Sequence, residues 1–507
     1  MQKCHLRKLI QPFYLISSFF LFSIFTSNCS TAPKKSESAL IHSNLENLRK
    51  KIVWLISDPN LFNAQVGIYI ESIDRGEAIF AQNEHKLFIS ASNMKMFTTA
   101  ATLLNFGPDF KYKTDVFSSQ PIKNGKIEGD LIIRGSGDPT IAPRFSNGDH
   151  EYFFRAWADS LSARGLKYIS GDIIGDASYF QTEPLGFGWQ WDDEPFWYSA
   201  QISALSYNDN CIDVTVVASD QIGQPPEVIL FPQTDYFSID NRAITTAPDS
   251  VRTLFITRPR LQNRLLIRNE IPINKPRYNE SISVEDPAKY FVYVLRDVLR
   301  QKGITIKGDV KSVKEADKIN YDQKNLLFTH YSPPLSDIIR AVNKRSQNLY
   351  AEQLLLTLAA EFGKTASATE GTKVVTNTLA GMGIPESEFL MHDGSGLSRV
   401  NLISPNSVGL LLRYMAVNKY FSYFFNSLPI SGIDGTLRKR MVSTTAEGKI
   451  RAKTGYVGHV RNLSGYAETE DGERLIFSIL VNNYLHPTAA INLLQDKICI
   501  LLANFKR

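Results

Sequence analysis

The stretch FISASNMKMFTTAATLL, residues 88–104, combines an apolar helical pattern with two polar residues that packing does not require. Ser92 and Lys95 are three residues apart, so on an α-helix they project from the same face and their side chains can meet. The following Gly107 and Pro108 predict the end of this helix. The pattern fits either a capped helix with a stray lysine or a serine nucleophile with its base.

The position of Ser92 favours the chemical interpretation. At a first helical turn, unpaired backbone N–H groups and the positive end of the helix dipole stabilise a developing oxyanion. Lys95 lies among Met94, Met96 and Phe97, and burial disfavours the charged form of lysine. An uncharged Lys95 can accept the hydroxyl proton of Ser92. The pair is weak evidence by itself, because a serine three residues before a lysine occurs about once by chance in a chain of this length.

A second polar pair, Ser346 and Asn348, lies in NKRSQNLYAEQLLLTLAA, residues 343–360, at the start of an otherwise apolar helix. Asn343, Ser346 or Asn348 can each simply cap this helix. In a functional site, Ser346 would instead relay a proton to a leaving amine, and Asn348 would hold a substrate amide. The local sequence is compatible with both interpretations.

The third cluster, Lys453-Thr454-Gly455, follows the strand-like alternation of KIRAK. It fits an edge strand protected by a lysine charge. In a binding site, Lys453 would supply positive charge, Thr454 would offer a hydroxyl to a substrate carboxylate, and Gly455 would leave room for a ligand near the backbone. The backbone N–H of Tyr456 could then pair with that of Ser92 as an oxyanion hole.

The ordered set Ser-x-x-Lys, Ser-x-Asn and Lys-Thr-Gly resembles the signature of penicillin-recognising serine enzymes. The gap of about 250 residues between the first two motifs is similar to that of one family, whose extra domains fill this interval, whereas related β-lactamases have far shorter gaps. This family is the low-molecular-mass class C penicillin-binding proteins, the D-alanyl-D-alanine carboxypeptidase/endopeptidases of peptidase family S13. Similar blocks recur over nearly the whole chain, at residues 129–140, 169–180, 186–195, 203–210, 392–405, 432–441 and 453–467.

The resemblance implies roles for the motif residues. Ser92 would be the acylated nucleophile and Lys95 its general base. Ser346 and Asn348 would complete the proton network and the substrate contact. The terminal carboxylate of the substrate would be bound by Lys453 and Thr454.

The resemblance further implies that Asp176 in GDASYF and Arg399 in GSGLSR clasp the charged end of a diaminopimelate-type side chain. The end of such a side chain carries an ammonium and a carboxylate group. An acidic residue can bind the ammonium, and an arginine can bind the carboxylate bidentately. Simple surface solvation is the alternative for each residue.

The expected fold class is α/β, with a β-lactamase/transpeptidase-like domain whose antiparallel sheet of about five strands is flanked by helices. Residues 39–110 and 325–507 would form this catalytic domain. The interval 111–324 reads mainly as β-structure and would form an insertion of two domains, one nested in the other.

The amino terminus has the pattern of an export signal. Lys3, Arg7 and Lys8 precede an uncharged apolar run over 13–25, which has the length of a signal-peptide core. Cys29 follows this run and resembles a bacterial lipoprotein cleavage site, although simple cleavage or a retained anchor fits as well. Residues 1–29 would thus be a signal peptide or lipoprotein signal, followed by a linker at 30–38. The mature protein is expected in the periplasm or cell envelope.

Composition narrows the function classes. The 507 residues carry 56 Lys+Arg and 51 Asp+Glu, a net charge of +5. Because the basic residues are dispersed, a nucleic-acid partner is not expected. Beyond Cys29 only Cys211 and Cys499 remain, and neither they nor the 8 histidines show zinc-ligand spacing. We therefore expect no metal and no cofactor.

The predicted reaction is acyl transfer to water. Ser92 would attack the carbonyl of a D-configured peptide bond in a peptidoglycan stem peptide or cross-link, and β-lactams would acylate the same serine. A β-lactamase would share the nucleophile but release the acyl group rapidly. A non-enzymatic peptidoglycan-binding protein of the envelope would keep the fold without needing Lys95.

Overall fold

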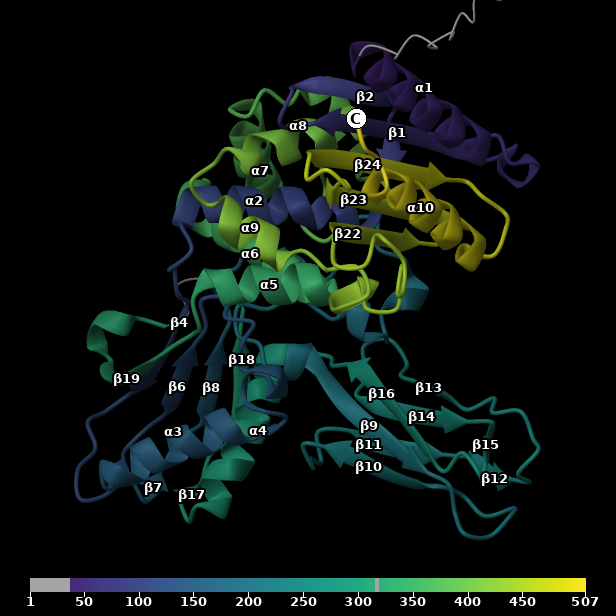
Figure 1. Ribbon diagram of the computed structural model, residues 1–507. Coiled ribbons are helices and arrows are strands. Elements are labelled where there is room, and N and C mark those ends of the chain that lie inside the picture. The colour runs from purple at the N-terminus through teal and green to yellow at the C-terminus, as the bar shows by residue number, and fades with distance from the viewer. Residues whose placement is uncertain (1–36, 315–318) are drawn as a thin grey trace, which may run out of the picture.

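The computed structural model describes residues 37–314 and 319–507. The predicted signal segment, residues 1–29, lies outside the described residues, as does most of the predicted linker 30–38. Figure 1 shows a central sheet between helices in the upper part of the molecule, and two lobes below it.

The central sheet has five strands in the order β2-β1-β24-β23-β22, and every neighbouring pair is antiparallel. On β24, Ile476 and Leu480 join one hydrophobic core, whereas Phe477 and Ile479 join another. Because successive side chains point to opposite faces, both faces of the sheet need cover. Segments far apart in the sequence supply the strands: β1 Gln65–Ser72, β2 Glu77–Gln82, β22 Ile450–Val457, β23 Val460–Glu468 and β24 Arg474–Asn482.

Helices cover both faces of this sheet (Figure 1). One face is covered by α1 Glu37–Ile56 and α10 Thr488–Ala503. The opposite core contains α2 Met94–Phe106, α5 Leu335–Arg345, α6 Asn348–Phe362, α7 Ala368–Ala380, α8 Pro405–Ala416 and α9 Phe421–Ser427. A small sheet has the order β20-β21-β3, with β3 Phe88–Ile89, β20 Phe389–Leu390 and β21 Leu402–Ile403, and β3 precedes α2 in the chain. The predicted α/β fold, an antiparallel sheet flanked by helices, is confirmed.

The first lobe is built on a five-stranded sheet in the order β18-β8-β6-β4-β19, lower left in Figure 1. Its strands are β4 Lys113–Ser118, β6 Leu131–Arg134, β8 Ile173–Asp176, β18 Val310–Val313 and β19 Asn325–Tyr331. Helices α3 Tyr152–Ala163 and α4 Pro287–Gln301 complete its core, and β5 Lys126–Ile127, β7 Tyr168–Ile169 and β17 Thr305–Ile306 form a smaller sheet. Since β19 pairs with β4, this sheet extends beyond residue 324.

The second lobe consists of short strands between β8 and α4 in the sequence, lower right in Figure 1. One sheet has the order β10-β9-β16, with β9 Cys211–Val217, β10 Glu227–Phe231 and β16 Arg277–Ser283. Another has the order β11-β14-β13, with β11 Ser238–Asn241, β13 Phe255–Thr257 and β14 Arg264–Arg268. The pair β12 Ile244–Thr246 and β15 Glu270–Pro272 extends the lobe.

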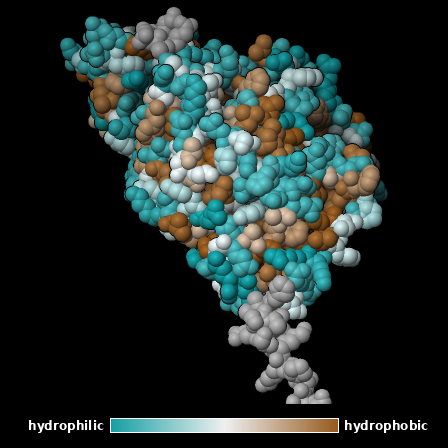
Figure 2. Space-filling model, turned by 90° about the horizontal axis from the view of Figure 1, so that it is seen from above, coloured by the Kyte–Doolittle hydropathy of each residue, from teal (hydrophilic) through white to brown (hydrophobic). Residues whose placement is uncertain are grey.

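The upper face of the molecule, where α1 begins the described chain, is shown in Figure 2. Hydrophobic residues on this face form separate patches among hydrophilic ones. Within 37–314 and 319–507, no helix combines the length and the apolar character that a membrane span requires.

Candidate active site

The turn that carries Ser92 directly precedes α2. Ala91–Asn93 form a single 3-10 turn, and α2 begins at Met94. Ala91 has φ of 41°, a left-handed conformation that residues with a Cβ rarely adopt. Such a conformation persists only where surrounding contacts fix the backbone. Because Ser92 is the second residue of the turn, its N–H has no acceptor within the helix.

Two asparagines tie this turn to the central sheet. Asn93 Nδ2 donates to the carbonyl oxygen of Lys453 at 2.9 Å, and Asn462 Nδ2 donates to the carbonyl oxygen of Ser90 at 2.9 Å. Lys453 lies on β22 and Asn462 on the neighbouring β23. The segment around Ser92 is therefore held at a fixed separation from the third motif.

Lys95 is fully buried, and its Nζ atom lies close to three oxygens. The distances are 2.9 Å to Ser92 Oγ, 2.6 Å to Asn348 Oδ1 and 2.6 Å to the carbonyl oxygen of Ser395. An ammonium group donates to all three. An uncharged amine donates to Asn348 and Ser395 and accepts the proton of the Ser92 hydroxyl with its lone pair. The geometry thus suits both protonation states, as a general base requires.

Burial lowers the pKa of Lys95 to about 7, because desolvation disfavours the ammonium form. The charges of Asp393 and Glu352 oppose this effect. Glu352 is buried as well, and its pKa is raised to about 8, first by burial and then by the charge of Asp393. Near neutral pH a substantial fraction of Lys95 is therefore uncharged.

The second motif lies at the junction of two helices. Ser346 is the C-cap residue of α5 with φ of 62°, and Asn348 is the first residue of α6, so neither is the N-cap of α6. Ser346 Oγ accepts a hydrogen bond from Lys453 Nζ at 2.9 Å. Asn348 Nδ2 donates to the carbonyl oxygen of Tyr198 at 2.6 Å. Both side chains of the motif therefore face the site that contains Lys95 and Lys453.

The third motif lies on β22, an edge strand of the central sheet. The N–H of Ala452 donates to the carbonyl oxygen of Pro429, away from β23. Backbone hydrogen-bonding direction alternates along a strand, so the N–H groups of Thr454 and Tyr456 point to the same side as that of Ala452. Among the described residues no further strand pairs with this edge. The Tyr456 side chain is 56% exposed, beside Arg461.

Gly455 lies close to neighbouring segments on the side where a side chain would project, and room for a ligand at its backbone stays a prediction. A Cβ at this position would lie 3.0 Å from Asn462 Cβ and 3.3 Å from both Ala91 Cβ and the carbonyl oxygen of Ser90. The space is therefore filled by the turn around Ser92. Gly455 serves the close approach of β22 to the nucleophile.

Lys453 and Thr454 form a polar corner beside Ser346. Lys453 is fully buried, and burial, with a smaller contribution from the charge of Lys95, lowers its pKa well below the usual value. A carboxylate nearby would favour the charged form again. Thr454 Oγ1 lies 2.8 Å from Thr436 Oγ1. The corner thus presents hydroxyl groups and a lysine to an incoming group.

Arg399 and Asp176 are not brought together. Arg399 Nη1 donates to the carbonyl oxygen of Gly458 at 2.7 Å, at the turn after β22. Asp176 ends β8 in the first lobe, is 1% exposed, and accepts hydrogen bonds from the Tyr321 hydroxyl and the Ser178 N–H. Its carboxylate is therefore used within the lobe, because GDASYF forms the end of a strand and a turn. Among the described residues no hydrogen bond or ion pair joins Asp176 to Arg399, so these contacts do not support the implied clasp.

Sequence reasoning missed the buried acids behind Lys95. Glu352 on α6 accepts hydrogen bonds from the N–H groups of Gly394 and Ser395 at 2.9 and 2.8 Å. These bonds hold the loop whose Ser395 carbonyl oxygen contacts Lys95. Asp393 binds the same loop through the N–H of Gly396 at 2.6 Å. The sequence signal for Glu352 was an acid within the apolar part of α6, whereas the other acid of this helix, Glu361, lies near its end.

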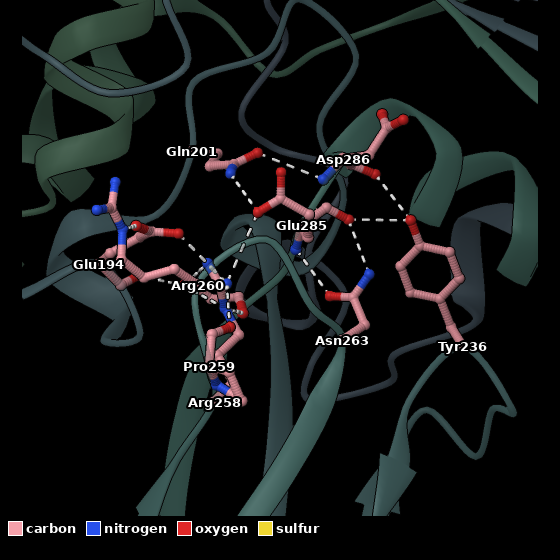
Figure 3. Close-up of polar contacts among 10 residues, drawn as sticks. Glu194, Gln201, Tyr236, Arg258, Pro259, Arg260, Asn263, Glu285 and Asp286 are labelled. Atoms are coloured by element: carbon pink, nitrogen blue, oxygen red, sulfur yellow. Dashed lines mark hydrogen bonds and ion pairs between the residues drawn. The ribbon is translucent and has the colours of Figure 1, made fainter. Parts of the chain in front are cut away.

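A buried polar network holds the loop that carries Tyr198 (Figure 3). Arg258 is buried, and its Nη1 lies 3.4 Å from Glu194 and 3.7 Å from Glu285. Glu194 also pairs with Arg260 at 2.6 Å. Figure 3 shows these side chains pointing toward one another in the second lobe. Because Tyr198 follows Glu194 by four residues, the network links this lobe to the contact on Asn348.

The two cysteines of the described chain take no part in the site. Cys211 and Cys499 are free and buried, and burial raises the pKa of both thiols. In the part of the chain that the structure describes, no group of three His, Cys, Asp or Glu residues could hold a metal ion. The polar groups that converge at the site are hydroxyls, amines, amides and buried acids.

Known proteins match this chain over nearly its full length. The model of the D-Ala-D-Ala carboxypeptidase 3 (S13) family matches residues 48–504. The D-alanyl-D-alanine carboxypeptidase of Actinomadura sp. (strain R39) is 32% identical over 475 residues, which cover 91% of this chain and 86% of that protein. The D-alanyl-D-alanine carboxypeptidase DacB of Haemophilus influenzae is 28% identical over 427 residues, 83% of this chain and 86% of that one.

Comparison with solved structures agrees with the sequence matches. The crystal structure of penicillin binding protein 4 (dacB) from Haemophilus influenzae has a TM-score of 0.77 and 25% identity, and the match covers 90% of this chain and 99% of that one. A serine and a lysine joined across a helical turn, beside an antiparallel sheet, define a serine hydrolase of the penicillin-binding class. The chain belongs to the D-Ala-D-Ala carboxypeptidase 3 (S13) family. The predicted family is confirmed, and with it the predicted class of serine D-Ala-D-Ala carboxypeptidases.

Proposed function

We propose that this protein hydrolyses peptidoglycan peptides through an acyl-enzyme, as a D-Ala-D-Ala carboxypeptidase and D,D-endopeptidase. Ser92 Oγ attacks the carbonyl carbon, and its proton passes to Lys95 Nζ. The N–H groups of Ser92 and Tyr456 stabilise the oxyanion. The C–N bond then breaks, and the leaving amine takes a proton through Ser346. Water hydrolyses the ester and restores the Ser92 hydroxyl.

The other motif residues hold the substrate. Asn348 orients Lys95 through its Oδ1 atom and binds the substrate amide. Lys453 and Thr454 bind the carboxylate of the residue that leaves. Arg399, whose guanidinium lies at the turn after β22, contacts a carboxylate of the substrate side chain. Asp176 has no role in this proposal, because its carboxylate is used inside the first lobe.

One observation carries the proposal. Lys95 Nζ is buried at 2.9 Å from Ser92 Oγ and at 2.6 Å from both Asn348 Oδ1 and the Ser395 carbonyl oxygen. Two donors and one lone pair of an uncharged amine match these three partners. This arrangement is what a base needs to activate a serine.

The experiment is acylation by a labelled penicillin, followed by intact-mass spectrometry. We expect one adduct on the wild-type protein and none on Ser92→Ala. Ser90→Ala is the matched control, because the Ser90 hydroxyl is buried without a hydrogen-bond partner among the described residues. The control variant should acylate like the wild type.

Three results would contradict the proposal or redirect it. No adduct on the wild type, or an equal adduct on Ser92→Ala, would overturn it. Rapid turnover of a chromogenic cephalosporin would indicate a β-lactamase instead. Undiminished acylation and peptide hydrolysis by Lys95→Ala would favour a protein that binds peptidoglycan without this chemistry.

We also propose the domain division. Residues 39–110 and 332–507 form the catalytic domain, and the two lobes form the insertion, with the second nested in the first. The boundary lies after Tyr331 rather than at residue 325, because β19 pairs with β4 of the first lobe. Limited proteolysis supports this division if it releases fragments with ends near residues 111 and 331, and contradicts it if cuts fall within the central sheet.

For location, we propose export to the cell envelope, with acylation of Cys29 as the anchor. The basic and apolar pattern of residues 1–29 supports this proposal. Replacement of Cys29 by serine should move the protein from the detergent phase to the aqueous phase. An unchanged partition would exclude the lipid anchor.

A further inference from the structure

A large cationic pocket lies next to the site, between α5, the segment 426–439 and β22. Its volume is about 1000 Å³. Six basic side chains line it: Arg340, Lys344, Arg345, Arg438, Lys439 and Arg451. The lining contains one acid, Asp434. We call this the cationic pocket.

Most of this positive charge is not neutralised by the protein. Asp434 pairs with Lys344 at 2.6 Å. Within residues 37–314 and 319–507, the side chains of Arg340, Arg345, Arg438 and Lys439 have no ion-pair or hydrogen-bond partner. Burial lowers the pKa of Lys344, and the charges of Arg451 and Arg340 add to that effect. Such a concentration of one sign attracts anions and raises their local concentration.

The cationic pocket adjoins the corner that we assign to the substrate carboxylate. Thr436 lines the pocket, and its Oγ1 lies 2.8 Å from Thr454 Oγ1. Arg345 immediately precedes Ser346, the residue proposed to protonate the leaving amine. Arg451 lies two residues before Lys453 on β22, so both side chains point to the same face. An extended leaving group would therefore enter this pocket.

The two proposed reactions differ in what leaves. A carboxypeptidase reaction releases one D-alanine with a single carboxylate, which the Lys453 and Thr454 corner can hold alone. Cleavage of a cross-link releases a whole second stem peptide, which carries further carboxylates. A cavity of about 1000 Å³ is far larger than one alanine requires, and its charge is opposite to that of the peptide.

We propose that the cationic pocket binds the leaving peptide of a cross-link through its additional carboxylates, and so favours endopeptidase cleavage over release of D-alanine. This inference rests on the proposed function of the same site. Arginine and lysine side chains bind carboxylates by charge-assisted hydrogen bonds, and arginine does so bidentately. Exposed pairs of this kind are screened by salt. Cleavage of the cross-link should therefore weaken with ionic strength more than release of D-alanine does.

The experiment compares two substrates on the full-length protein: a purified cross-linked muropeptide dimer and a stem pentapeptide ending in D-Ala-D-Ala. The test variant is Arg438→Gln/Lys439→Gln, which removes two exposed charges of the pocket. The matched control is Lys51→Gln/Lys497→Gln, which removes two exposed charges on α1 and α10. For each protein we measure the ratio of kcat/KM for the dimer to kcat/KM for the pentapeptide.

We expect the ratio to fall about fivefold to tenfold in the test variant and to stay unchanged in the control. Amidation of the carboxylates on the leaving peptide should lower the wild-type ratio by a similar factor. An unchanged ratio in the test variant, or a wild-type protein that does not cleave the dimer, would overturn the inference. Either result leaves the acyl-enzyme mechanism and the carboxypeptidase part of the proposed function intact if the pentapeptide is still hydrolysed and penicillin still acylates Ser92. Loss of both would instead end the proposed function.

Discussion

Lys95 and Lys453 are both fully buried, yet their neighbours prepare them for different tasks. Lys95 faces Ser92 Oγ, and the charges of nearby acids partly offset the effect of burial on its pKa. For Lys453 the neighbouring charges, Lys95 first, act in the same direction as burial. A carboxylate from the substrate would therefore stabilise the charged form of Lys453. Recognition of that carboxylate depends on this lysine together with Thr454.

The Thr454 hydroxyl gives a test at this scale. We expect Thr454→Val to lower kcat/KM for peptides with a free terminal carboxylate about tenfold to a hundredfold, because a hydrogen bond to a charged group is lost. Thr454→Ser keeps the hydroxyl and should retain most of the activity. The measurement is D-alanine release from a stem pentapeptide and from its carboxamide. An equal loss for both substrates would contradict a role in carboxylate binding.

At the same scale, three short sequence motifs, together with the chemistry that their side chains can perform, identified residues that meet at the site. Ser92, Lys95 and Lys453 could be found because each motif has a fixed local spacing. The surroundings of Asp176 and Gly455 could not be predicted, because they depend on contacts with distant segments. The acid of GDASYF is taken by Tyr321, and the space beside Gly455 is filled by the turn around Ser92.

At the scale of elements, the loop between residues 186 and 199 connects the second lobe to the site. Its Tyr198 carbonyl accepts from Asn348, and its Glu194 is held by Arg258 and Arg260. Glu194 and Arg258 have almost no solvent exposure, at 2% each. Breaking a buried pair by removing one partner leaves an uncompensated charge.

We therefore expect Arg258→Met to lower the free energy of unfolding by about 3–5 kcal/mol. Arg260→Met should cost less than about 1 kcal/mol, because the Arg260 side chain is 58% exposed. Urea denaturation of both variants measures the difference. If Arg258→Met were as stable as Arg260→Met, the buried network would not anchor the loop. In either case, the rate of penicillin acylation of the folded Arg258→Met protein shows whether the loop still positions Asn348.

The sequence predicted which segments near the site form helices and strands better than it predicted which strands pair with one another. Helical periodicity indicated the helix that follows Ser92 and the helix that contains Asn348, and the alternation of KIRAK indicated strand β22. The pairing of β19 with β4 was not foreseen, because register between distant strands is not encoded in a local pattern. For the same reason we propose a domain boundary after Tyr331 rather than at residue 325.

At the scale of the whole molecule, the site exists only because the two ends of the chain fold together. Ser92 lies near the start of the described chain, Lys453 near its end, and Ser346 between them after the two lobes. Three short distances join these segments: 2.6 Å from Lys95 to Asn348, 2.9 Å from Lys453 to Ser346 and 2.9 Å from Asn93 to Lys453. The family resemblance predicted this meeting, while periodicity and composition alone could not.

The central claim is that this assembly presents Ser92 to a lysine that loses its proton near neutral pH. The most direct measurement is the second-order rate of penicillin acylation of the wild-type protein as a function of pH. The pKa of Lys95 is lowered to about 7, and the base is the deprotonated form, which predominates above the pKa. We therefore predict that the rate rises through about pH 7 to a plateau at higher pH. A rate that is independent of pH across this range, or that falls as pH rises through it, would contradict the account.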